Sequence, residues 1–110
     1  MSRPRRGAIF VASVTGREVP VVVVSSNSVN DANPTIVIVP AVSKEELRGA
    51  TYPNLVVVPQ GTIALEGEWV FVCTNLRSLH PDQLTVSAGT LSASLMTKIG
   101  NALRTVLELN

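Results

Sequence analysis

Short runs of β-branched residues, each ended by glycine, proline or asparagine, constrain the fold of this chain more than any other feature. Residues 19–26, VPVVVVSS, place four valines in a row, which is typical of a strand covered on both faces or lying at a subunit contact. Proline has no N–H to donate to a sheet, so Pro20 is expected at the start of its strand or on an edge. The expected strands are residues 8–14, 19–26, 35–42, 54–59 and 68–75, with residues 63–65 as a candidate sixth.

In the last part of the chain the spacing of apolar residues changes from the strand pattern to a helical one. Apolar residues recur at spacings of three and four from Leu95 through Ile99 to Leu107, with Lys98 and other charged residues off that stripe, and Ser92 is the predicted N-cap. The pattern predicts an amphipathic helix. We therefore expect a mostly β protein with a C-terminal helix, a small twisted β-barrel or sheet of five to six short strands packed on it.

The connections between these elements are short. Residues 27–34, NSVNDANP, have the composition of a loop, and residues 60–62 are typical of a tight turn. Ser43 is followed three residues later by Glu46, the pattern of a capping box, and Gly49 follows closely. We expect one short helical turn after Ser43.

Size, charge and cysteine content indicate one domain. The chain has 110 residues and a net charge of +1, which argues neither for nor against a nucleic-acid partner. Residues 1–6, MSRPRR, are predicted to be a disordered basic tail, and residues 7–110 a single domain. Cys73 is the only cysteine, so a cytoplasmic location is expected, and no run is long enough for a membrane helix.

Five sequence blocks occur in an order that resembles a known family. They are RGAIFVASV, VPVVVVSSNSVN, PTIVIVPAVS, CTNLRSLHPDQL and AGTLSASLMTKIGNAL. They resemble the successive blocks of the MazF/Kid (PemK-like) toxins, from an RGDIW-like opening to a G-x-L…M…I…AL helix. The resemblance covers the chain from Arg6 to Leu107, and it depends on the order and intervals of the blocks.

The resemblance implies a fold and an activity. The fold would be the compact SH3-like barrel of MazF/CcdB-type homodimers. The activity would be a sequence-specific endoribonuclease that cleaves single-stranded RNA, often mRNA, without a metal or cofactor. In this chemistry the ribose 2′-OH attacks the adjacent phosphate and leaves a 2′,3′-cyclic phosphate and a 5′-OH. A cognate antitoxin would silence it.

The resemblance also implies candidate catalytic residues. Arg77 matches the arginine of the family's QIRT motif and would hold a phosphate bidentately, although a surface or dimer-face arginine that pairs with Asp82 or a glutamate explains it as well. Ser43 matches a position tied to the scissile phosphate, or it caps a helix. Arg17 and Glu18 lie on the loop that borders the RNA groove, where Arg17 would neutralise phosphate and Glu18 would act as base, unless both are simply solvated.

Three further residues are candidates for RNA binding. Asn75 replaces the family's usual glutamine, and Ser78 follows Arg77 in the same block. His80 is the only histidine and would be the natural acid or base near neutral pH, although a histidine in a turn is also typical of a structural or solvated residue.

Several positions depart from the family pattern. Val19 replaces the arginine that normally precedes the proline of the second strand, and Thr74 replaces an acidic residue. Cys73 is interpreted as a small buried hydrophobe in preference to a nucleophile. The alternative function is therefore a catalytically impaired protein of this fold that binds RNA, an antitoxin or another protein.

Overall fold

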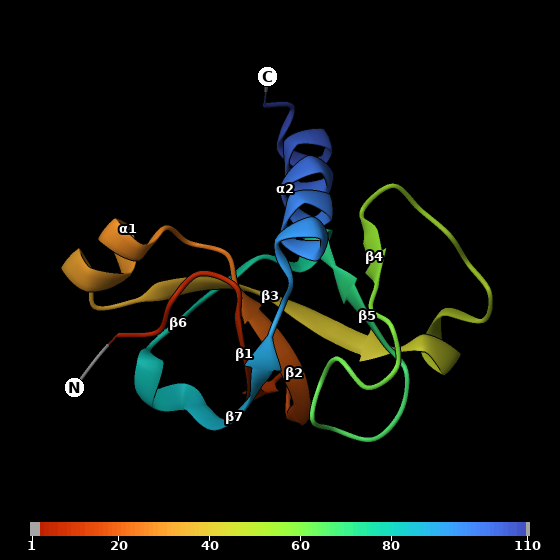
Figure 1. The fold of residues 1–110 in the computed structure, drawn as a ribbon, viewed down its shortest axis with the longest axis horizontal. Coiled ribbons are helices and arrows are strands. Elements are labelled where there is room, and N and C mark those ends of the chain that lie inside the picture. Colours follow the sequence, from red (N-terminus) through yellow and green to blue (C-terminus); the bar gives the residue numbers. More distant parts are fainter. Residues whose placement is uncertain (1–2, 110) are drawn as a thin grey trace.

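A computed structural model describes residues 3–109 (Figure 1). The chain forms seven strands in one antiparallel sheet and a long C-terminal helix, which confirms the predicted fold class. The strands are β1 (Ala8–Val14), β2 (Arg17–Val23), β3 (Ile36–Ser43), β4 (Leu55–Val57), β5 (Trp69–Val72), β6 (Arg77–Leu79) and β7 (Leu84–Thr90); the helices are α1 (Asn27–Ala32), α2 (Ala93–Leu107) and the short 3-10 helices η1 (Lys44–Leu47), η2 (Cys73–Asn75) and η3 (Pro81–Gln83).

The sheet is open, in the order β4-β5-β3-β2-β1-β7, and does not close into the barrel that was one of the two expected forms. β3 organises it because it pairs with three strands: β6 along its first half, β5 along its second half and β2 between them. Pro40 lies within β3 and does not interrupt it. It lies opposite Val21 at the end of the β2 pairing, immediately before the pairing with β5 begins at Ala41.

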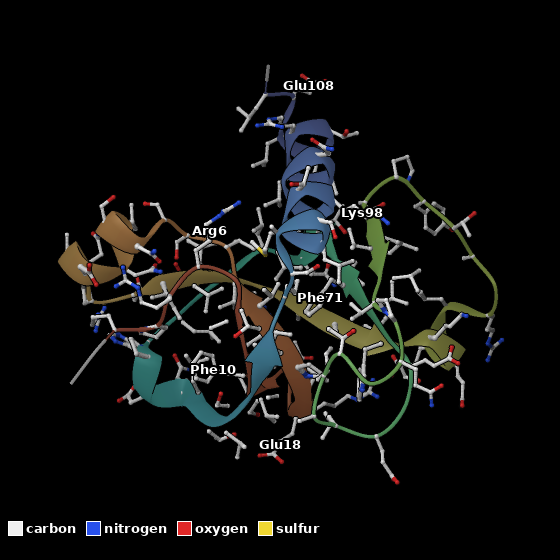
Figure 2. The ribbon with its side chains drawn as sticks, viewed as in Figure 1. Arg6, Phe10, Glu18, Phe71, Lys98 and Glu108 are labelled. Atoms are coloured by element: carbon white, nitrogen blue, oxygen red, sulfur yellow. The ribbon has the colours of Figure 1, made fainter. Side chains whose placement is uncertain are left out.

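Two hydrophobic clusters cover opposite faces of β2. Val22 and Val24 belong to the larger cluster, which includes Phe71 of β5 and Ile99 of α2. Val21 and Val23 belong to the second cluster. Figure 2 shows Phe71 beneath α2, at the centre of the molecule. The run of four valines is thus explained, since alternate side chains of one strand are buried on both sides.

The helix α2 confirms the C-terminal prediction. The Ser92 hydroxyl accepts a hydrogen bond from the backbone N–H of Leu95 at 3.3 Å, so Ser92 is the N-cap. Ile99 is fully buried and Leu95 nearly so. Within residues 3–109 no helix is long and apolar enough to cross a membrane.

Two predictions about local structure are wrong, and the strands β6 and β7 were not predicted. Residues 27–32 form the helix α1 where a loop was expected, because the Ser26 hydroxyl caps it by accepting from Val29 N–H. β7 was missed altogether because only Ala88 in it is buried and its side chains show no apolar alternation. The candidate strand at residues 63–65 is absent; this stretch crosses the edge of β7, where Ala64 N–H donates to Ala88 O at 2.9 Å.

Residues 3–6 were expected to belong to a disordered tail, and in the structure they lie against α1. Arg5 forms an ion pair with Asp31 at 2.9 Å, and Arg3 Nε donates to the carbonyl of Asn30 at 2.7 Å. The Asn30 side chain is fully buried and donates to the Pro4 and Ser25 carbonyls. Residues 1 and 2 lie outside the described part of the chain.

Candidate functional site

One cavity, of about 270 Å³, gathers polar residues from two separate parts of the chain. Arg17, Asn75 and Arg77 line it together with the apolar side chains of Val19 and Val42. Arg17 opens β2, Asn75 ends η2 and Arg77 opens β6. Three of the seven residues proposed for the site therefore share one cavity.

Local backbone geometry places Arg17 and Arg77 at this cavity. The β1–β2 turn passes through Thr15 and Gly16 with φ of 51° and 79°, so the chain reverses within two residues and β2 begins at Arg17. A non-glycine residue with positive φ is uncommon, so Thr15 marks a tight turn. Arg77 is fixed because it is opposite Ile38 in the β3–β6 ladder.

Arg17 makes a bidentate ion pair with Glu46 of η1. Nη2 lies 2.6 Å from Oε1 and Nη1 lies 3.1 Å from Oε2. These hydrogen bonds to Arg17 hold the pKa of Glu46 below its ordinary value, and those to Glu46 raise the pKa of Arg17. Sequence reasoning missed this role of Glu46, although the capping-box spacing had singled the residue out.

Arg77 differs from Arg17 because no acidic side chain within residues 3–109 forms an ion pair with it. Within these residues the structure therefore shows no pairing of Arg77 with Asp82 or a glutamate. An exposed guanidinium at a cavity wall retains its donors for an anionic ligand, and arginine binds phosphate bidentately.

Ser43 lies beside the cavity and not in its lining. It ends β3 and precedes η1 as the N-cap residue, but its hydroxyl makes no capping hydrogen bond, so the predicted capping box is incomplete. Ser43 lines the neighbouring groove, and Glu46, three residues later in η1, pairs with Arg17, which lines the cavity.

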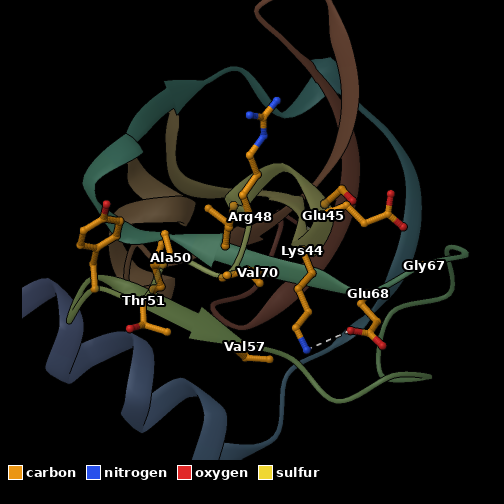
Figure 3. A pocket seen from close by; sticks show the side chains of 14 residues that line it. Lys44, Glu45, Arg48, Ala50, Thr51, Val57, Gly67, Glu68 and Val70 are labelled. Carbon is orange, nitrogen blue, oxygen red and sulfur yellow. Dashed lines mark ion pairs between the residues drawn. The ribbon is translucent and has the colours of Figure 1, made fainter.

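That neighbouring groove is larger and more apolar (Figure 3). It has a volume of about 610 Å³ and lies between η1, the segment that follows it, β4 and β5. Leu55, Val57 and Val70 form apolar parts of its lining, Tyr52 is 60% exposed at it, and the Lys44–Glu68 ion pair, 3.2 Å long, borders it.

The other proposed residues lie outside the lining of the Arg17–Arg77 cavity. Glu18 lies at the far end of the β1–β2 hairpin and is exposed (Figure 2). Ser78 follows Arg77 in β6, and successive strand residues point to opposite faces. His80 is exposed, and its backbone N–H donates to Gln83 Oε1 at 2.8 Å.

The departures from the family pattern are visible in the same region. Val19 is buried and lines the cavity, so an apolar side chain occupies the wall next to Arg17. Thr74 is exposed, and its hydroxyl accepts from Asn54 Nδ2 at 3.3 Å. Cys73 is fully buried, and burial raises the pKa of its thiol to about 11, which supports its interpretation as a small hydrophobe. No cluster of three or more potential metal-ligating side chains occurs in the described part of the chain.

Comparison with known proteins decides the family. The sequence model of the PemK-like, MazF-like toxins of type II toxin–antitoxin systems matches residues 5–107. The chain belongs to this family. The resemblance inferred from the five sequence blocks is thereby confirmed.

Solved structures of the family share the whole fold. An endoribonuclease in complex with its cognate antitoxin, from a mycobacterial species, is 26% identical with a TM-score of 0.83, and the match covers 97% of each chain. A mycobacterial endoribonuclease is 27% identical with a TM-score of 0.81, covering 99% of this chain and 95% of that one. A MazE–MazF complex of Deinococcus radiodurans is 20% identical with a TM-score of 0.78 over 98% of both chains, a likeness of fold alone. Among curated proteins, none matches the sequence.

Proposed function

We propose that this chain is a toxin of a toxin–antitoxin system that cleaves single-stranded RNA at short sequence motifs, using the cavity between Arg17 and Arg77 as its phosphate site. The observation that carries the proposal is the convergence of Arg17, Asn75 and Arg77, which are up to 60 residues apart in the sequence, in one cavity. Two guanidinium groups and an amide can together hold a phosphate that gains charge during reaction.

The proposed chemistry needs no metal. The ribose 2′-oxygen forms a bond to phosphorus while its proton passes to a base, the bond from phosphorus to the 5′-oxygen breaks, and that oxygen takes up a proton. The products are a 2′,3′-cyclic phosphate and a 5′-OH. Arg77 and Arg17 stabilise the phosphorane, and Asn75 orients it.

The remaining candidate residues act around that site. Ser43, beside the cavity, binds the RNA next to the scissile phosphate. Glu18 takes the 2′-proton when RNA fills the space beside the β1–β2 turn. Ser78 and His80 contact the strand beyond β6. Glu18 and His80 are exposed in the structure, so bound RNA would bring the reacting atoms to them.

The proposed partners, an antitoxin and a second copy of this chain, are inferred from the family. One similar mycobacterial endoribonuclease is in complex with its cognate antitoxin. We propose that this chain is a cytoplasmic homodimer and that an antitoxin neutralises it by binding.

A second function, RNA or antitoxin binding without cleavage, is supported by a specific observation. None of the described residues that line the cavity has a carboxylate or imidazole, and Val19 stands where relatives have an arginine. A site with cations and no proton-transfer group would bind phosphate without cleaving it.

The deciding experiment incubates purified protein with a long single-stranded RNA in EDTA and identifies the ends of the products. The proposal predicts cuts at recurrent short motifs, each leaving a 2′,3′-cyclic phosphate and a 5′-OH. Bound but intact RNA at high protein excess, from folded protein, would leave the binding function in its place.

A further inference from the structure

The Glu46 carboxylate connects separate parts of the proposed site. It accepts two hydrogen bonds from Arg17, at 2.6 and 3.1 Å, and it belongs to η1, which directly follows Ser43. Arg17 and Glu46 are 29 residues apart in sequence. A single side chain therefore joins the residue after the β1–β2 turn to η1, the helical turn that follows β3.

Arg17 needs such an anchor because of where it lies. It follows directly on a tight turn, and its side chain is 64% exposed. A long side chain at that position would otherwise sample many rotamers, and a cation must be held in place to stabilise a transition state. Other exposed arginines of the chain, such as Arg48, have no comparable bidentate partner among the described residues.

The geometry of the pair leaves Arg17 able to bind RNA. Glu46 accepts from Nη1 and Nη2, one hydrogen from each. A guanidinium has five N–H donors, so Nε–H and a second hydrogen on each terminal nitrogen remain for a phosphate oxygen. The carboxylate can thus orient Arg17 without using up its capacity to donate.

We propose that Glu46 is a positioning residue of the ribonuclease site, which holds the Arg17 guanidinium at the cavity. The inference rests on the proposed function and adds to it a residue that does not itself contact RNA. Val19 stands where the family pattern has an arginine. In this chain Glu46 orients Arg17 without a second arginine at that position.

The proposal predicts opposite effects on binding and on rate. Removing an acidic group next to an RNA site removes a repulsion, so the affinity for RNA should be unchanged or higher. The rate of cleavage should nevertheless fall, by about tenfold, because Arg17 is no longer held in place. A merely electrostatic or structural role for Glu46 would not produce this combination.

The test measures single-turnover cleavage of a single-stranded RNA and binding of a fully 2′-O-methylated RNA of the same sequence, which lacks the attacking hydroxyl. The variants are Glu46→Ala, Arg17→Ala, the double variant, and Glu45→Ala as control. Glu45 lies in the same short helix, is exposed and carries the same charge, but forms no ion pair with Arg17. Urea unfolding verifies that each variant is folded.

We expect Glu46→Ala to lose about tenfold in cleavage rate with undiminished RNA binding. Glu45→Ala should cleave at the wild-type rate. In the Arg17→Ala background, adding Glu46→Ala should change the rate less than twofold. Cleavage by Glu46→Ala at or above the wild-type rate would overturn the inference alone. So would an equal loss in the Arg17→Ala background, because Glu46 would then act by another route. Wild-type protein that leaves the RNA intact would refute the proposed function, and this inference with it.

Discussion

Replacing Asn30 by alanine should destabilise the fold more than its place in a short polar helix suggests. Asn30 is the only fully buried polar side chain among the described residues. Its Nδ2 donates to the Pro4 carbonyl at 3.0 Å and to the Ser25 carbonyl at 3.1 Å, and its Oδ1 accepts from the Ser25 hydroxyl. The substitution leaves these three groups without that partner.

The expected loss can be estimated from these contacts. Each intramolecular hydrogen bond contributes about 1 kcal/mol net, so three bonds correspond to about 3 kcal/mol. Alanine has the higher helix propensity, which returns about 0.5 kcal/mol. We expect the free energy of unfolding to fall by about 2–3 kcal/mol.

The assay is equilibrium unfolding in urea, with Asn33→Ala as control. Asn33 ends the same helix and is exposed, and its side chain makes one local bond, to Val29 O at 3.2 Å. Asn33→Ala should cost less than about 0.5 kcal/mol, as surface substitutions usually do. Equal, small losses for both variants would refute the view that Asn30 ties residues 3–6 to the body of the protein.

Three further predictions concern packing, the thiol and acid stability. Ile99→Ala should lower the free energy of unfolding by about 2–4 kcal/mol in urea titration, because Ile99 is fully buried, whereas Leu107→Ala, at a side chain 49% exposed, should cost under about 1 kcal/mol. The Cys73 thiol, with a pKa of about 11, should resist a thiol-reactive dye in native protein at pH 8 and react on unfolding; rapid native labelling would contradict its burial. The folded-state pKa of Glu46 is lowered, so the stability from its pair with Arg17 is present above pH 4.5 and is lost as pH falls through the lowered value; the stability difference between wild type and Glu46→Ala should therefore close below pH 4.5.

The sequence predicted those elements whose burial follows a simple period. Alternate valines of β2 enter two clusters, and the stripe containing Leu95 and Ile99 faces the larger cluster. In both cases the hydrophobic pattern and the local propensity agree, so pattern alone identifies the element. The Ser92 N-cap was predictable for the same reason.

The missed elements lack that pattern. β7 exposes most of its side chains, including Val86 at 61%, because it is an edge strand. Its stability comes from pairing with β1, which the sequence does not reveal. α1 consists of residues that favour loops, and it forms because Ser26 caps it and the buried Asn30 anchors it.

The candidate site was likewise predicted from the sequence only in part. Short sequence motifs identified Arg77, Asn75 and Arg17, and the fold brings these residues into one cavity. The separation of Ser43 from them, and the pairing of Arg17 with Glu46, depend on how η1 lies against the β1–β2 turn. Such tertiary contacts have no periodic signal in the sequence.

In the proposed function, the cavity lined by Arg17, Asn75 and Arg77 holds the scissile phosphate. The most direct test is the single-turnover rate of RNA cleavage by Arg77→Ala, with Arg104→Ala as control. Arg104 is an exposed arginine of α2 whose side chain contacts Asn101. Loss of one transition-state donor predicts a fall of about 10²- to 10³-fold for Arg77→Ala and an unchanged rate for Arg104→Ala. A folded Arg77→Ala variant that cleaves within threefold of the wild-type rate would contradict this role of the cavity.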